Sequence, residues 1–98
     1  MLNIDKIRDE LEGFSDLKTK LDRLAEIVSE QFGVDFYFCE VIGKRWSFFA
    51  GREDVYMPLT RIEITEKYGI IIDDTNISKT TISDIVIMIK KIMQNITS

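Results

Sequence analysis

Apolar residues recur every three or four positions near both ends of the chain, which is the spacing of one face of an α-helix. Two such stretches predict helices over about 3–12 and 16–32. Ser15 and Gly33 have the residue types that begin and end the second helix. A third stretch predicts a helix over about 81–96.

Between these helical stretches the apolar residues alternate with polar ones, which is typical of β-strands. The pattern predicts four strands, at about 34–42, 45–50, 55–65 and 68–73. The apolar phase shifts inside the third strand, which predicts a bulge near Thr60. Four successive strands predict an α+β fold with an antiparallel four-stranded β-meander, flanked by the N-terminal helices and the C-terminal helix.

Composition narrows the class of protein. The chain has 98 residues, so we expect residues 1–98 to form a single domain. The net charge of −4 argues against a general nucleic-acid binder, which would need basic residues to neutralise phosphates. The sequence contains neither an apolar run long enough to cross a bilayer nor a secretory signal pattern. With Cys39 as the single cysteine, the expected location is the cytoplasm, without a membrane partner.

The sequence offers little catalytic chemistry. It contains no histidine, which excludes serine–histidine and cysteine–histidine nucleophile systems and zinc sites built from cysteine and histidine. The glycine-rich phosphate-binding patterns are absent as well. Asp73 and Asp74 are interpreted as turn residues, and Cys39 as a small buried apolar side chain. We therefore expect a protein that is not an enzyme, with no catalytic residues, no metal and no cofactor.

Most of residues 20–96 resemble a GAF domain, a small-molecule-sensing relative of the PAS fold. The helix at 21–28 and the strand that follows it are similar to the opening of that family. An apolar-Pro-Leu strand at 55–59, a Gly-apolar strand at 68–72 and the final amphipathic helix are similar to its closing pattern. The resemblance implies a GAF/profilin-like fold and a regulatory role.

The chain departs from the family between its second and third predicted strands. GAF domains usually insert helices and loops there, and those pieces build one wall of the ligand pocket. Only residues 51–54 fill that gap here, so the resemblance implies a minimal member without the usual pocket wall. The family's cyclic-nucleotide signature is also absent.

Two groups of residues are candidates for function. Aromatic and basic side chains of the predicted sheet are candidates for ligand binding: Arg45, Trp46, Arg52, Tyr56 and Arg61. The last helix has an apolar stripe wider than one contact face requires, so it is expected to contact a second surface besides the sheet. That surface is either the helix at 4–12 or a second copy of the chain. The candidates for a homodimer interface are Ile85, Ile89, Ile92, Met93 and Ile96.

Three functions remain open at this point. The first is a non-enzymatic, GAF-like regulatory or protein-interaction module that binds another protein or forms a homodimer through its last helix. The second is a small-ligand sensor that uses the aromatic face of the sheet. The third is a small acidic partner protein of the chaperone or antitoxin kind, which the size and the charge suggest.

Overall fold

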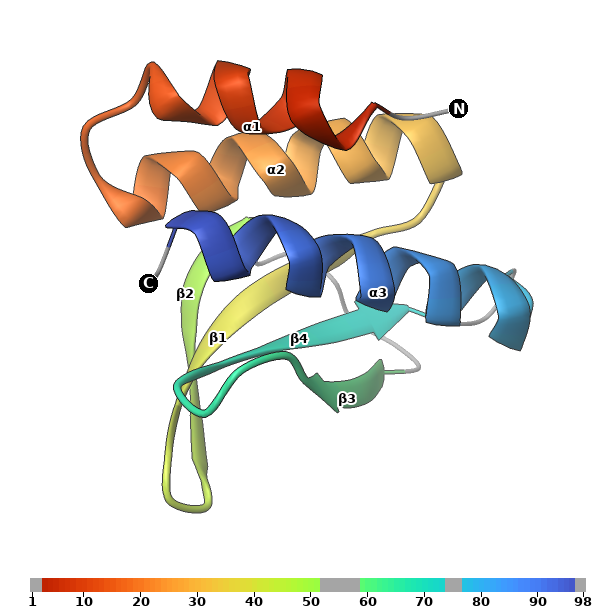
Figure 1. Ribbon diagram of the computed structural model, residues 1–98. Helices are drawn as coiled ribbons and strands as arrows, with labels where there is room; N and C mark the ends of the chain where they lie inside the picture. Colours follow the sequence, from red (N-terminus) through yellow and green to blue (C-terminus); the bar gives the residue numbers. More distant parts are fainter. Residues whose placement is uncertain (1–2, 52–58, 74–76, 97–98) are drawn as a thin grey trace.

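The computed structural model describes residues 3–51, 59–73 and 77–96 as three helices and one sheet (Figure 1). The elements, in chain order, are α1 (Ile4–Glu12), α2 (Leu17–Phe32), β1 (Phe36–Ile42), β2 (Arg45–Gly51), β3 (Leu59–Glu63), β4 (Tyr68–Asp73) and α3 (Lys79–Ile96). The α+β class, the four-stranded antiparallel sheet, the two N-terminal helices and the C-terminal helix are confirmed.

The strand order differs from that of a simple meander. The strands lie in the order β2-β1-β4-β3, so two hairpins meet through an antiparallel β1–β4 pair, and β2 and β3 form opposite edges. Burial explains why β1 and β4 take the central places. The residues from Gly69 to Ile72 are all buried, and strands buried on both faces belong in the middle of a sheet.

Polar side chains fix where the first two helices begin. The Asn3 side chain accepts a hydrogen bond from the Lys6 N–H at the start of α1. At the start of α2 the capping residue is Asp16, not Ser15 as predicted. Its carboxylate accepts from the N–H and the hydroxyl of Thr19, and these bonds hold the pKa of Asp16 below its usual value.

The core lies between the sheet and the helices, which occupy one side of the sheet (Figure 1). Alternate residues of β1 and β4 point to this side, because successive side chains of a strand face opposite ways. α1 packs against both α2 and α3 and closes the core. The fully buried side chains at its centre include Leu11, Leu21, Leu24, Val28, Phe36, Phe38, Ile70, Ile72, Ile85, Ile89, Ile92 and Met93.

A register shift lies in the β1–β2 hairpin, between Phe38 and Cys39. Within the described residues of β3, Leu59–Glu63, the pairing with β4 is regular, so these residues contain no bulge of the kind predicted near Thr60. Residues 55–58 of the predicted strand lie outside the described residues. The shift lets two successive residues of β2, Phe49 and Ala50, both contact the core. The preceding residue, Phe48, turns to the other face of the sheet, where it contacts Tyr37.

Candidate functional site

The sheet has a second face, opposite the helices, which we call the open face because none of the described helices covers it (Figure 1). Along each strand, side chains that point to this face alternate with side chains that point to the core. Gly69, for example, lies between the core residues Tyr68 and Ile70 and therefore points away from the helices. The side chains on the open face include those of Tyr37, Cys39, Val41, Trp46, Phe48, Arg61, Glu63 and Ile71.

Trp46 lies on this face, near the start of the edge strand β2. Its ring extends from β2 across β1 and rests against Gly69 of β4, where a Cβ atom would overlap the ring. The guanidinium carbon of Arg61, from β3, lies 5.7 Å from the centre of the ring. This distance is within the range of a cation–π contact. The sheet thus brings together residues of three strands on one face.

Exposed apolar side chains gather on the β1–β2 hairpin. Phe48 is 37% exposed, with its ring centre 5.6 Å from that of Tyr37, and Ile42 at the end of β1 is 66% exposed. Gly43 begins the turn of this hairpin with a φ of 62°, a conformation that favours glycine in a two-residue turn. Figure 1 shows the hairpin projecting away from the helices.

The structure brings together part of the predicted ligand-binding set. Trp46 and Arg61 are in contact, as described above. Arg45 is exposed at the start of β2, where its backbone faces Ile42. Arg52 and Tyr56 lie outside the described residues.

Only some of the basic side chains in the described part of the chain form ion pairs. On α1 and α2, Arg8, Lys18 and Arg23 form ion pairs of 2.8–3.0 Å with neighbouring carboxylates, whereas Lys6 and Lys20 form none with the described residues. Lys44, Arg45 and Arg61 are exposed, and none of them forms an ion pair with a carboxylate of the described residues. The open face therefore carries charges of both signs, Arg61 and Glu63, and Lys44 and Arg45 add positive charge at the turn of the hairpin.

The predicted interface residues of the last helix lie inside the protein. Ile85, Ile89, Ile92 and Met93 are fully buried, and Ile96 packs partly buried against the same core. The second contact of α3 is with α1, so the alternative in which the helix at 4–12 covers the stripe describes the structure. The four fully buried side chains are inaccessible to a partner in the folded chain, whereas Ile96 remains partly exposed.

Cys39 lies on the open face and is buried. Burial raises the pKa of its thiol to about 11, and the nearby positive charge of Arg61 opposes this shift. A thiol with such a pKa is almost fully protonated near neutral pH and is a poor nucleophile. This agrees with the structural role predicted for Cys39.

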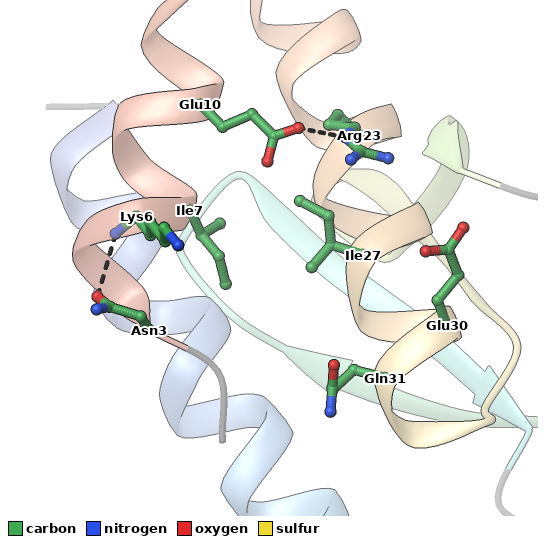
Figure 2. A pocket seen from close by; sticks show the side chains of 8 residues that line it. All are labelled: Asn3, Lys6, Ile7, Glu10, Arg23, Ile27, Glu30 and Gln31. Atoms are coloured by element: carbon green, nitrogen blue, oxygen red, sulfur yellow. Dashed lines mark hydrogen bonds and ion pairs between the residues drawn. The ribbon is translucent and has the colours of Figure 1, made fainter.

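A groove of about 790 Å³ runs between α1 and α2 (Figure 2). Ile7 and Ile27 approach each other across it, and the Arg23 guanidinium donates to the Glu10 carboxylate at one end. This bond raises the pKa of Arg23. The remaining lining residues are Asn3, Lys6, Glu30 and Gln31. Opposite charges line both walls, so the groove favours no single class of ligand.

A second groove, of about 480 Å³, lies beside the end of β2. α2 contributes Asp22, Glu26, Glu30 and Lys18 to its walls, and Gly51 contributes the strand end. Asp22 accepts a 2.8 Å hydrogen bond from the Gly51 N–H, which fixes α2 to the strand. Sequence analysis missed this contact, because an aspartate inside an amphipathic helix carries no signal of a partner 29 residues away.

The remaining candidates are the two aspartates after β4, metal sites and membrane-spanning helices. Asp74 lies outside the described residues, and the Asp73 N–H donates to the Asp35 carbonyl oxygen at 3.0 Å. Within residues 3–51, 59–73 and 77–96, no three or more acidic or cysteine side chains gather closely enough to hold a metal ion. Over the same residues, no helix is long and apolar enough to cross a membrane.

No family model, curated protein or solved structure matches this chain.

Proposed function

We propose that the chain is a non-enzymatic, GAF-like regulatory module that binds another protein through the open face of its sheet and the β1–β2 hairpin. The observation that carries this proposal is the contact between Arg61 and Trp46 beside the exposed ring of Phe48. Aromatic residues and arginine are enriched at protein interfaces, where each combines a large apolar surface with a polar group.

The exposed apolar surface supports the proposal. Ile42 and Phe48 are two of the three large apolar side chains that are exposed in the described part of the chain, and both belong to one hairpin. Phe48 points to the open face and Ile42 to the opposite face of the hairpin, so a partner that contacts both side chains would enclose the hairpin.

The charges indicate what kind of partner fits. Lys44, Arg45 and Arg61 lack ion-pair partners among the described residues; the first two lie at the turn of the hairpin and its adjoining strand end, and Arg61 lies on the open face. A partner segment that presents an apolar side chain flanked by carboxylates would match both properties. The expected occupant of the open face is therefore an acidic segment of another protein.

The experiment compares proteins captured by the immobilised chain and by three variants. Arg61→Glu and Phe48→Ser change the open face, and Lys90→Glu reverses an exposed charge on α3 as the matched control. The proposal expects a protein that binds the wild type and Lys90→Glu, is lost with the other two, and binds again as a purified component with salt-dependent affinity. It is overturned when no such protein is found, or when Lys90→Glu causes the same loss.

A second candidate function rests on the same contact. The indole ring of Trp46 and the guanidinium of Arg61 would hold a planar anionic ligand by stacking and by charge. A panel of aromatic carboxylates should then raise the melting temperature of the wild type but not of Trp46→Leu. An equal response of the two proteins would exclude this candidate.

A further inference from the structure

We propose that two copies of the chain associate through the outer edge of β3, as antiparallel strands related by a two-fold axis at Ile62. The inference goes beyond the proposed function, because it concerns the edge of the sheet that lies opposite to β2 and its hairpin. The product would be one continuous eight-stranded sheet with both open faces on the same side.

The first argument is that β3 has a regular edge, which pairs with no other described strand. β3 is the last strand of the order β2-β1-β4-β3, and Leu59–Glu63 pair with β4 without a register shift. Just after β3, the Ile64 N–H donates to the Tyr68 carbonyl oxygen at 3.0 Å, so the backbone of Ile64 is directed toward β4. Because these directions alternate along an antiparallel strand, the backbone groups of Arg61 and Glu63 point outward, where a partner strand can bind them.

The second argument is the pattern of charge along this edge. Arg61 and Glu63 are both exposed on the open face, and neither forms an ion pair with a described residue. Charges on an edge strand usually prevent pairing. These two charges have opposite signs and lie two residues apart. An antiparallel copy centred on Ile62 therefore sets each arginine opposite the glutamate of the other copy, once on each side of the axis.

The same charges select this register against its neighbours. An axis at Arg61 would place two arginines opposite each other, and an axis at Glu63 would place two glutamates opposite each other. Like charges that oppose each other destabilise an antiparallel pair. A shift by a single residue would set outward-directed backbone groups opposite groups that point to β4. Of these registers, the axis at Ile62 alone satisfies both the charges and the backbone hydrogen bonds.

The third argument is the residue at the axis. Ile62 is only partly buried, and it packs against the core on the helix side of the sheet. In the proposed pairing the two Ile62 residues form a non-hydrogen-bonded pair, in which the Cα atoms are about 4.5 Å apart. Their side chains would contact each other across the axis and remove further apolar surface from water.

The first test measures dimer dissociation by sedimentation equilibrium on the full chain. Arg61→Glu and Glu63→Arg should each weaken the dimer by about tenfold or more, because each variant opposes like charges on both sides of the axis. The double variant Arg61→Glu/Glu63→Arg should recover most of the wild-type affinity, since the charges are exchanged. Glu12→Arg is the control, an exposed change of the same kind at the end of α1, and should leave the affinity unchanged.

The second test cross-links the axis directly. In a Cys39→Ala background, Ile62→Cys should form an intermolecular disulfide on mild oxidation, because Cα atoms about 4.5 Å apart lie within the range of a disulfide. Thr60→Cys is the matched control on the same face of β3. It lies two residues from the axis, so its thiols would be more than about 10 Å apart in the same dimer and should not cross-link.

The outcomes of these tests are decisive once circular dichroism has verified that each variant is folded. The inference is overturned by a monomer at all concentrations, by a double variant that shows no recovery, or by equal cross-linking of Ile62→Cys and Thr60→Cys. Phe48→Ser separates the inference from the proposed function, because it should abolish capture of the partner protein and leave the dimer intact. A monomeric wild type would leave the proposed function standing, since capture is measured separately.

Discussion

Gly69 of β4 and Trp46 of β2 fit together across the intervening strand β1. A Cβ atom on Gly69 would lie 2.5 Å from Cη2 of the Trp46 ring and 2.9 Å from the Ile62 carbonyl oxygen. Only glycine leaves room for the ring at this position. The contact therefore fixes the position of the ring that Arg61 covers.

Gly69→Ala should destabilise the protein by about 1–3 kcal/mol, the usual cost of adding an atom to a filled site. The added methyl group must displace the Trp46 ring, and fluorescence of this single tryptophan should shift at the same time. Urea unfolding followed by circular dichroism measures the loss. The double variant Trp46→Ala/Gly69→Ala should show less than the sum of the two single losses, and full additivity would contradict the contact.

Ile89→Glu should unfold the protein instead of dissociating a dimer. The side chain of Ile89 is fully buried, and an unpaired carboxylate there costs several kcal/mol, a large part of the stability of a small domain. Met93→Glu should behave in the same way. The matched control is Ile87→Glu, on the same helix but 52% exposed, which should remain folded. Far-ultraviolet circular dichroism distinguishes the outcomes, and a folded Ile89→Glu variant would be inconsistent with the described core.

The Cys39 thiol should react slowly in the folded protein. Its pKa of about 11, against 9.0 for a free thiol, lowers the thiolate fraction at about pH 8 by roughly 100-fold. Alkylation by iodoacetamide should therefore be markedly slower than in the urea-unfolded chain, because burial lowers the thiolate fraction and restricts access of the reagent. A rate equal to that of the unfolded chain would show that the thiol is neither buried nor perturbed.

The same thiol makes stability depend on alkaline pH. Between about pH 9 and 11 the unfolded chain releases the Cys39 proton while the folded protein keeps it. The stability present below pH 9 is therefore lost as the pH rises toward 11. The urea midpoint of the wild type should fall between these values by more than that of Cys39→Ala, and equal falls would contradict the raised pKa.

Asp22→Ala should destabilise the protein by about 1–2 kcal/mol, because it leaves the Gly51 N–H without its acceptor. Lys18→Ala removes the ion pair to Asp22 but keeps that acceptor, so its loss should be much smaller. Urea midpoints of the two variants make the comparison. Equal losses would assign the effect to the ion pair and not to the bond with the strand.

The sequence predicted the elements well because periodicity is a local property. The helix over 16–32 and the strand over 68–73 agree with α2 and β4 to within one residue. The strand order was not predictable in the same way. The two possible arrangements pair either β2 with β3 or β1 with β4. The choice depends on which strands are buried on both faces, and the residue pattern within a single strand does not determine its neighbours in the sheet.

The candidate site was also predictable only in part: residue types could be recognised from the sequence, but their tertiary contacts could not. Trp46 and Arg61 could be selected from the sequence, because aromatic and basic residues on a predicted strand are recognisable candidates for ligand binding. It could not find Gly69, whose role is only to leave space for the ring. It also could not decide what the apolar stripe of α3 contacts, because burial by α1 and burial by a second copy demand the same residues.

The central β1–β4 pair has a consequence for how the chain folds. Each hairpin closes locally, but Phe36 pairs with Ile72, and this contact must bring distant parts of the chain together. Closing a long loop costs entropy before any of its contacts can compensate for it. The slow step expected in refolding is therefore the docking of two preformed hairpins, with the helices condensing on the sheet that this docking creates.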